Sequence, residues 1–218
     1  MDELQIQATP EPTLGASRQK KALIIAIRKT SDPELRELGC PHRDAKNIGK
    51  LLIEVYGYNA GNVVTLLDAD DEDSRRNSNQ PTRTNMIKHM CDLTQDAQPG
   101  DQFFFYFSGH STQDINMSGT EEDGKDEYMM TGEGSCIRDN DLRKYLVDSL
   151  PAGCQLTAVL DTCHSGSLLD LSHYRCNRVF GPQRSDSWRK GRTNVPNEAE
   201  GNVPHPPQII DFQGEKST

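Results

Sequence analysis

The sequence predicts an α/β domain in which a mostly parallel sheet is packed between helices. Four short apolar runs have the length of buried strands, and segments with helical spacing or polar loops separate them. Strands that alternate with helices indicate parallel pairing through right-handed crossovers. The apolar fraction of 33% and the mean hydropathy of −0.75 are low, which indicates that part of the chain adds nothing to the core.

The first half of this domain supplies two strands and a helix. "KALIIAI" (21–27) is a continuous apolar run rich in isoleucine, as expected for a strand buried on both faces. "DAKNIGKLLIEVYGY" (44–58) carries apolar residues at helical spacing, and Asp44 can cap the start of that helix. "NVVTLLD" (62–68) predicts the second strand.

A hydrophilic loop over 69–81 precedes the second half. Thr84 can cap the next helix. "DQFFFYF" (101–107) and "CQLTAVL" (154–160) predict the third and fourth strands, and a helix from Asp139 or Asn140 to Leu150, stopped by Pro151, lies between them. The apolar positions of the helix that Thr84 begins are Ile87, Met90, Cys91 and Leu93.

The two ends of the chain differ in composition from its middle. Residues 1–19 are polar and are expected to be a flexible lead-in, and residues 20–171 form the predicted domain. Residues 172–218 are rich in proline, asparagine and arginine, and the sequence predicts a disordered, linker-like tail there.

Charge and hydropathy exclude several classes of partner. With 24 basic and 33 acidic residues the net charge is −9, so the chain lacks the basic surface that nucleic acids attract. An acidic balance suits a substrate that carries lysine or arginine. The apolar runs are too short to cross a membrane, and the start "MDELQIQATPEPT" lacks the pattern of a signal peptide. A soluble protein of the cytoplasm, or also of the nucleus, with no membrane partner is expected.

The six cysteines lack the close spacing of a disulfide framework or of a zinc knuckle, so reduced and mostly structural thiols are expected. Neither cysteine-histidine pair, "CPH" or "CH", has further ligands at zinc-site spacing. A serine hydrolase is also disfavoured, because no segment around the histidines fits the G-x-S-x-G elbow. The cysteines are Cys40, Cys91, Cys136, Cys154, Cys163 and Cys176.

A histidine and a cysteine follow the two most hydrophobic strands. Ligands of open α/β sheets bind beyond the carboxyl ends of the strands, and His110 and Cys163 are both predicted at that edge. An imidazole favours the thiolate of a nearby cysteine and can pass a proton to a leaving amine. The alternative is a loop histidine and an inert thiol. His164 ranks behind His110 as the base, because consecutive side chains diverge.

Two motifs then identify a family. "FFFYFSGHS" (103–111) and "DTCHSGSLLDL" (161–171) resemble the large catalytic subunit of the metacaspases, which are caspase-related cysteine peptidases. The resemblance extends over about 20–171 and includes the "GC…DAKNI…LL" segment. It implies a caspase-like three-layer sandwich, with Cys163 as nucleophile and His110 as general acid and base, and it needs no cofactor for the chemistry. The backbone N–H groups of Cys163 and Ser111 would form the oxyanion hole, although the family commonly has glycine at position 111.

The resemblance also implies a substrate preference. Metacaspases cleave peptide and protein substrates after arginine or lysine, and Asp161 falls on the acidic residue of their specificity pocket. Ser108 and Asp44 fall on the supporting positions. The segment "GCPHRDA" is one residue longer than the family spacing, so for Asp44 the role of helix cap stays open.

Calcium activation is a further implication, because many metacaspases hold calcium with oxygen ligands. The matching positions are Asp126, Asp139, Asn140 and Asp170, with Asn140 replacing an acidic residue. The acidic loop 119–127 is otherwise an ordinary solvated surface. Fewer carboxylates predict weaker calcium binding.

Metacaspases continue into a small subunit, and no strand-like run that could build it is expected after residue 172. Three explanations stay open: a fragment, a large subunit that needs a separate small-subunit chain, or a catalytically impaired caspase-like binding module. The linker between family subunits is cut when the zymogen matures, and cell death and protein clearance are both roles of the family. Basic sites for such self-cleavage are Arg175, Arg178, Arg189, Lys190 and Arg192.

Overall fold

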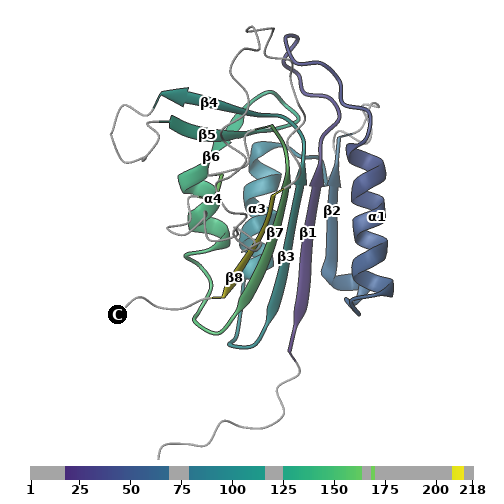
Figure 1. Ribbon diagram of the computed structural model, residues 1–218, viewed down its shortest axis with the longest axis vertical. Helices are drawn as coiled ribbons and strands as arrows, with labels where there is room; N and C mark the ends of the chain where they lie inside the picture. The colour runs from purple at the N-terminus through teal and green to yellow at the C-terminus, as the bar shows by residue number, and fades with distance from the viewer. Residues whose placement is uncertain (1–17, 69–78, 116–124, 164–167, 170–207, 214–218) are drawn as a thin grey trace, which may run out of the picture.

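The computed structural model describes residues 18–68, 79–115, 125–163 and 168–169, and the backbone of a strand at 208–213. Strands and helices alternate along most of this length (Figure 1). The elements are β1 (Lys20–Ala26), α1 (Pro41–Glu54), the short 3-10 helix η1 (Ala60–Asn62), β2 (Val63–Leu67), α3 (Arg83–Thr94), β3 (Gln102–Ser108), β4 (Ser111–Ile115), β5 (Lys125–Met130), β6 (Cys136–Arg138), α4 (Asp139–Leu146), β7 (Gln155–Asp161) and β8 (Gln208–Gln213).

The central sheet has the strand order β2-β1-β3-β7-β8, and its first four strands are parallel. This confirms the predicted α/β class with a mostly parallel sheet. Helix α1 packs on one face, and α3 and α4 pack on the other, so the domain has three layers (Figure 1).

Each face of the sheet has its own hydrophobic core because successive strand residues point to opposite sides. In β1, Leu23 and Ile25 face the core that contains α3 and α4, whereas Ala22 and Ile24 face α1. The alternation continues in β3, where three phenylalanines lie in the larger core and Tyr106 lies in the smaller one. The phenylalanines are Phe103, Phe105 and Phe107.

A second, antiparallel sheet of order β4-β5-β6 begins immediately after His110. The sequence analysis did not predict it. The polar β4 segment "STQDI" is mostly exposed and has no apolar face to mark it as a strand. Pairing with β5, of which Glu127 and Met129 are buried, determines its conformation.

Two predicted helix starts are corrected. Helix α1 begins at Pro41, three residues before Asp44, because proline suits the first helical position; Asp44 therefore does not cap it. Helix α3 is capped by Thr82, whose hydroxyl oxygen accepts the Asn85 N–H at 3.3 Å, and not by Thr84. As a result Met86 is buried and Cys91 is exposed. Helix α4 ends at Leu146, four residues before the predicted end.

Strand β8 also corrects the sequence analysis, which expected a disordered segment from residue 172 onward. Its backbone pairs antiparallel with β7, with Ile210 opposite Ala158. The edge of β7 gives "QIIDFQ" a partner that composition alone does not reveal. The remaining residues of the predicted tail, and residues 1–17 of the predicted lead-in, lie outside the described part of the chain.

The described cysteines are free thiols, but only Cys154 among them is buried. The expected reduced state is thus confirmed for the described cysteines, but Cys40, Cys91 and Cys136 are exposed and do not pack in the core. Among the described helices, none has the length and hydropathy of a membrane span.

Candidate active site

One rung of the parallel sheet fixes the positions of His110 and Cys163. Strands β3 and β7 pair in register, and their last residues, Ser108 and Asp161, lie opposite each other. His110 and Cys163 each follow this rung by two residues, at the carboxyl edge of neighbouring strands. The structure thus brings together two segments that are 53 residues apart.

Hydrogen bonds join the residues on either side of His110 to the two residues before Cys163. The Gly109 N–H donates to the carbonyl oxygen of Asp161 at 3.4 Å. The hydroxyl of Thr162 donates to the hydroxyl oxygen of Ser111 at 2.7 Å. Because one bond lies before the histidine and the other after it, the two loops are held side by side at the site.

The imidazole of His110 is oriented by a backbone carbonyl. Its Nε2 lies 2.8 Å from the oxygen of Arg36. A carbonyl oxygen only accepts hydrogen bonds, so Nε2 must carry the proton, and in the neutral ring Nδ1 is the basic nitrogen. Sequence reasoning missed Arg36, since a backbone carbonyl leaves no signature in residue type.

The loop that contains Arg36 is itself fastened to the end of β1. The Leu38 N–H donates to the Arg28 carbonyl at 2.8 Å, and the Arg28 guanidinium pairs with the Glu37 carboxylate. The carbonyl that orients His110 is therefore fixed by the segment that follows β1.

Glycine is required between the end of β3 and His110. A Cβ atom at Gly109 would lie 2.8 Å from Cζ of Phe107, which is closer than a real Cβ approaches another heavy atom. Phe107 is fully buried and cannot move away. Packing against the core therefore requires a glycine at position 109, whether or not a substrate approaches there.

Ser111, where the metacaspases commonly have glycine, adopts ordinary strand backbone. Asp96 is the one non-glycine residue with positive φ in the described part of the chain, so Ser111 is not strained by its side chain. The Met130 N–H donates to the His110 carbonyl at 3.0 Å, which makes residues 110 and 130 a hydrogen-bonded pair. Alternation along an antiparallel ladder then directs the Ser111 N–H to the side of β4 away from β5.

The thiol of Cys163 is exposed. Residues 164–167, which include the competing His164, lie outside the described part of the chain.

Two of the three predicted specificity residues, Asp44 and Asp161, line one pocket, and the third, Ser108, contacts Asp161. This pocket of about 730 Å³ lies on the α1 face of the sheet, and both Asp44 and Asp161 line it. The buried Ser108 hydroxyl is 3.5 Å from a carboxylate oxygen of Asp161. Asp44 also contacts the exposed Arg43 guanidinium at 3.2 Å. Aromatic and aliphatic side chains form the rest of the walls, among them Leu52, Tyr58, Phe104 and Val159.

Tyr106 is a further pocket residue, which sequence reasoning missed. Burial first, and then the nearby carboxylates of Asp161 and Asp44, raise the pKa of the Tyr106 phenol to about 12. The phenol is therefore neutral at physiological pH, and both carboxylates interact with it electrostatically. The strand pattern could have identified Tyr106, because it alternates with the three buried phenylalanines of β3.

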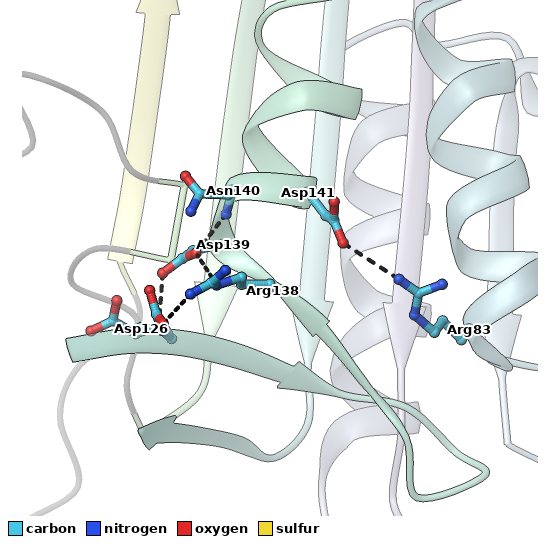
Figure 2. A network of polar contacts seen from close by, with 7 residues as sticks. Arg83, Asp126, Arg138, Asp139, Asn140 and Asp141 are labelled. Carbon is cyan, nitrogen blue, oxygen red and sulfur yellow. Dashed lines mark hydrogen bonds and ion pairs between the residues drawn. The ribbon is translucent and has the colours of Figure 1, made fainter. Parts of the chain in front are cut away.

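The predicted calcium positions do not form a cation site in the described residues. Arg138 lies between Asp126 and Asp139 (Figure 2). Asn140 is exposed, Asp170 lies outside the described residues, and no group of three or more histidine, cysteine or acidic side chains is arranged to hold a metal among those that are described.

Comparison with known proteins matches the region in which the sequence motifs lie. The family model "Metacaspase, peptidase C14 domain" matches residues 20–172. The chain is 42% identical over 158 residues to Metacaspase-1 of Cryptococcus neoformans, which covers 71% of this chain and 33% of the relative. It is 40% identical over 175 residues to Metacaspase-1 of Saccharomyces cerevisiae, which covers 77% of this chain and 39% of the relative. The chain thus matches between a third and two fifths of the length of these curated relatives.

A solved structure has a similar fold. The crystal structure of protein GSU0716 from Geobacter sulfurreducens superposes with a TM-score of 0.53 at 25% identity, over 72% of this chain and 55% of that one. The domain therefore has the caspase-like three-layer architecture that the sequence motifs imply.

Proposed function

The chain belongs to the metacaspase family, and from that premise we propose that it is a cysteine endopeptidase that cleaves after arginine or lysine. The observation that carries this proposal is the shared rung of Ser108 and Asp161. His110 and Cys163 each follow this rung by two residues, and Asp161 of the same rung lines a pocket, which supports the proposal.

The chemistry starts at the thiol. Cys163 Sγ attacks the scissile carbonyl carbon while its proton passes to Nδ1 of His110, which is basic because Nε2–H is held by the Arg36 carbonyl. The same Nδ1 then protonates the leaving amine, and a thioester remains on Cys163. Water, deprotonated by His110, hydrolyses the thioester and releases the acid and the free thiol.

The developing oxyanion takes hydrogen bonds from the backbone N–H groups of Ser111 and Cys163. A donor of this kind is typically worth about 3 kcal/mol in the transition state. The backbone at Ser111 supports the assignment. Its φ is not positive, so a serine can present the N–H there without backbone strain.

The acidic pocket supplies the preference for basic residues. Asp161 and Asp44 line it, and the apolar walls suit the methylene stem of lysine or arginine. A guanidinium or ammonium group can then form charge-assisted hydrogen bonds with a carboxylate. An aspartate side chain would instead be repelled.

A peptide assay tests the proposal. A fluorogenic peptide that ends in arginine should be cleaved, whereas its aspartate counterpart should not. An acyloxymethyl ketone probe with arginine next to the reactive group should modify Cys163, as located by mass spectrometry. His110→Ala should lose turnover, and Cys163→Ala should lose turnover and labelling. Labelling of other cysteines at equal rates would contradict the assignment.

Self-processing is the second part of this proposal. Incubation of the chain should yield a shorter product cut after one of the basic tail residues, and Cys163→Ala should never yield it. The tail residues Arg175, Arg178, Arg189, Lys190 and Arg192 lie outside the described part of the chain. Equal fragmentation of both proteins would exclude self-cleavage.

A caspase-like binding module is the alternative. Because the chain matches only part of its relatives, a separate small-subunit chain may be added to the assay from the matching region of a longer relative. A folded chain that stays inert toward peptides and probe with this addition would favour binding over catalysis. The presence of both His110 and Cys163 favours the peptidase.

A further inference from the structure

The junction of β5, β6 and α4 carries the carboxylates at which the family resemblance predicts calcium. Asp126 and Asp139 have exposed fractions of only 3% and 0%. Two buried carboxylates in one place need compensation by positive charge or by hydrogen-bond donors. The structure shows which groups supply it.

The first carboxylate is compensated by arginine. The Arg138 guanidinium pairs with Asp126 through Nη2, and its Nε lies 4.0 Å from an oxygen of Asp139. Figure 2 shows the Arg138 guanidinium beside both carboxylates, so that one side-chain cation faces the two of them. Asp126 in turn raises the pKa of Arg138, so the guanidinium keeps its charge.

The second carboxylate is satisfied by the backbone. Asp139 accepts the N–H of Glu127 at 2.8 Å on one oxygen and the N–H of Asn140 at 2.6 Å on the other. It lies in the first turn of α4, where a negative charge is favourable. One oxygen therefore ties the start of α4 to β5, and the other is engaged with the backbone of α4 itself.

The neighbouring acidic residues do not complete a metal site. Asp141 turns away toward Arg83 at 3.4 Å (Figure 2). Glu127 is buried with one carboxylate oxygen unpartnered, but it follows Asp126 in β5 and so points to the opposite face of the strand. There its other oxygen accepts from the Gln113 amide at 2.9 Å.

We infer that the Arg138 guanidinium stands in for a divalent cation at this junction, so that the chain folds and holds its β4-β5-β6 sheet without calcium. The sequence motif predicted calcium from the acidic positions alone. The structure disagrees because the register of β5 and β6 sets Arg138 opposite Tyr128, on the same face as Asp126.

Strands β4 and β5 connect the Arg138 junction to the candidate active site. Met130 at the end of β5 donates its N–H to the His110 carbonyl, and Ser111 begins β4. An internal cation that fixes β5 against β6 thus also supports the strand pair from which His110 emerges. No catalytic step passes through Arg138, so the inference stands independently of the proposed function.

Thermal unfolding and calorimetry of the whole chain test it. The wild-type chain should unfold at the same temperature in EGTA, in millimolar CaCl₂ and in millimolar MgCl₂, and titration with CaCl₂ should give no saturable heat. Arg138→Met removes the charge but keeps a similar length. Its Tm in EGTA should fall by roughly 3–6 °C, and CaCl₂ but not MgCl₂ should restore part of the loss.

Two matched variants sharpen the test. Arg138→Lys retains a cation and should show no response to calcium. Arg83→Met removes the neighbouring, more exposed ion pair with Asp141 and a hydrogen bond to the Cys136 carbonyl, and whatever its Tm, it should show no response to calcium. If Arg138→Met does not fold, Arg138→Gln replaces it.

Three results would overturn the inference. A saturable calcium-specific rise in the Tm of the wild-type chain would show that calcium binds in spite of Arg138. An unchanged Tm of Arg138→Met in EGTA would show that the guanidinium compensates nothing. An Arg138→Met chain that is destabilised but indifferent to calcium would reduce Arg138 to an ordinary ion pair.

Discussion

The carboxyl edge of the parallel sheet and the junction of β5 with α4 both gather acidic side chains, but they use them differently. At the sheet edge, Asp161 meets the hydroxyl of Ser108 and lines an open pocket. At the junction, Asp126 and Asp139 are buried and are matched by a guanidinium and two backbone N–H groups. The first arrangement leaves negative charge for a ligand, and the second neutralises it within the chain.

The difference teaches that a motif position predicts a ligand only when its neighbours leave it available. Both sets of acidic residues come from the same family pattern. Asp161 lines an open pocket, whereas Asp126 is paired with Arg138 of the next strand. Substitutions in the two regions should therefore have opposite effects on activity and on stability.

The largest effect is expected for Asp161→Asn. Removal of a charge-assisted hydrogen bond to the substrate should lower kcat/KM for arginine peptides by about 10- to 150-fold. The Tm should change little, since Asp161 is only partly buried. Steady-state kinetics and thermal unfolding check this, and an unchanged preference for arginine over aspartate would place the specificity pocket elsewhere.

Asp126→Asn should reverse that profile. The variant retains the shape of a buried side chain but removes the closer of the two carboxylates that Arg138 faces, so the Tm should fall by about 3–6 °C. The preference for arginine peptides should persist. Urea denaturation and the same peptide pair provide the measurement. A loss of specificity with normal stability would show that Asp126 belongs to the substrate-binding site.

Gly109→Ala tests how firmly packing sets the sheet edge. The new Cβ would clash with the buried Phe107 ring, so the free energy of unfolding should drop by about 1–3 kcal/mol. Gly39→Ala is the control, because a Cβ there meets nothing within 4 Å. The prediction fails if the two variants are equally stable in denaturant.

The smallest effect concerns pH. The folded-state pKa of Tyr106, about 12, lies above the ordinary value of 10.0, so the unfolded chain loses this proton first. Stability from this group is complete below pH 10 and is lost as the pH rises toward 12. Ultraviolet titration of the phenolate and unfolding of Tyr106→Phe, which should lose less stability over that range, test this. Asp161→Asn should lower the pKa of Tyr106, whereas Asp126→Asn should leave it unchanged.

The parts of the fold that could be predicted are those where burial requires a recognisable pattern of apolar residues. The four parallel strands are continuous apolar runs, and the topology then carries Ser108 and Asp161 to one rung. The β4-β5-β6 sheet was missed because β4 is polar, and with it the register that pairs Arg138 to Asp126. The Arg36 carbonyl was missed because any residue type could supply it.

The common rung beneath His110 and Cys163 also limits how this gene can change in length. Each of the two residues follows the rung by two positions, so inserting or deleting one residue between 108 and 110, or between 161 and 163, would change the position of one reactive group relative to the other. Insertions that preserve the fold should therefore accumulate in the connections at the other ends of these strands.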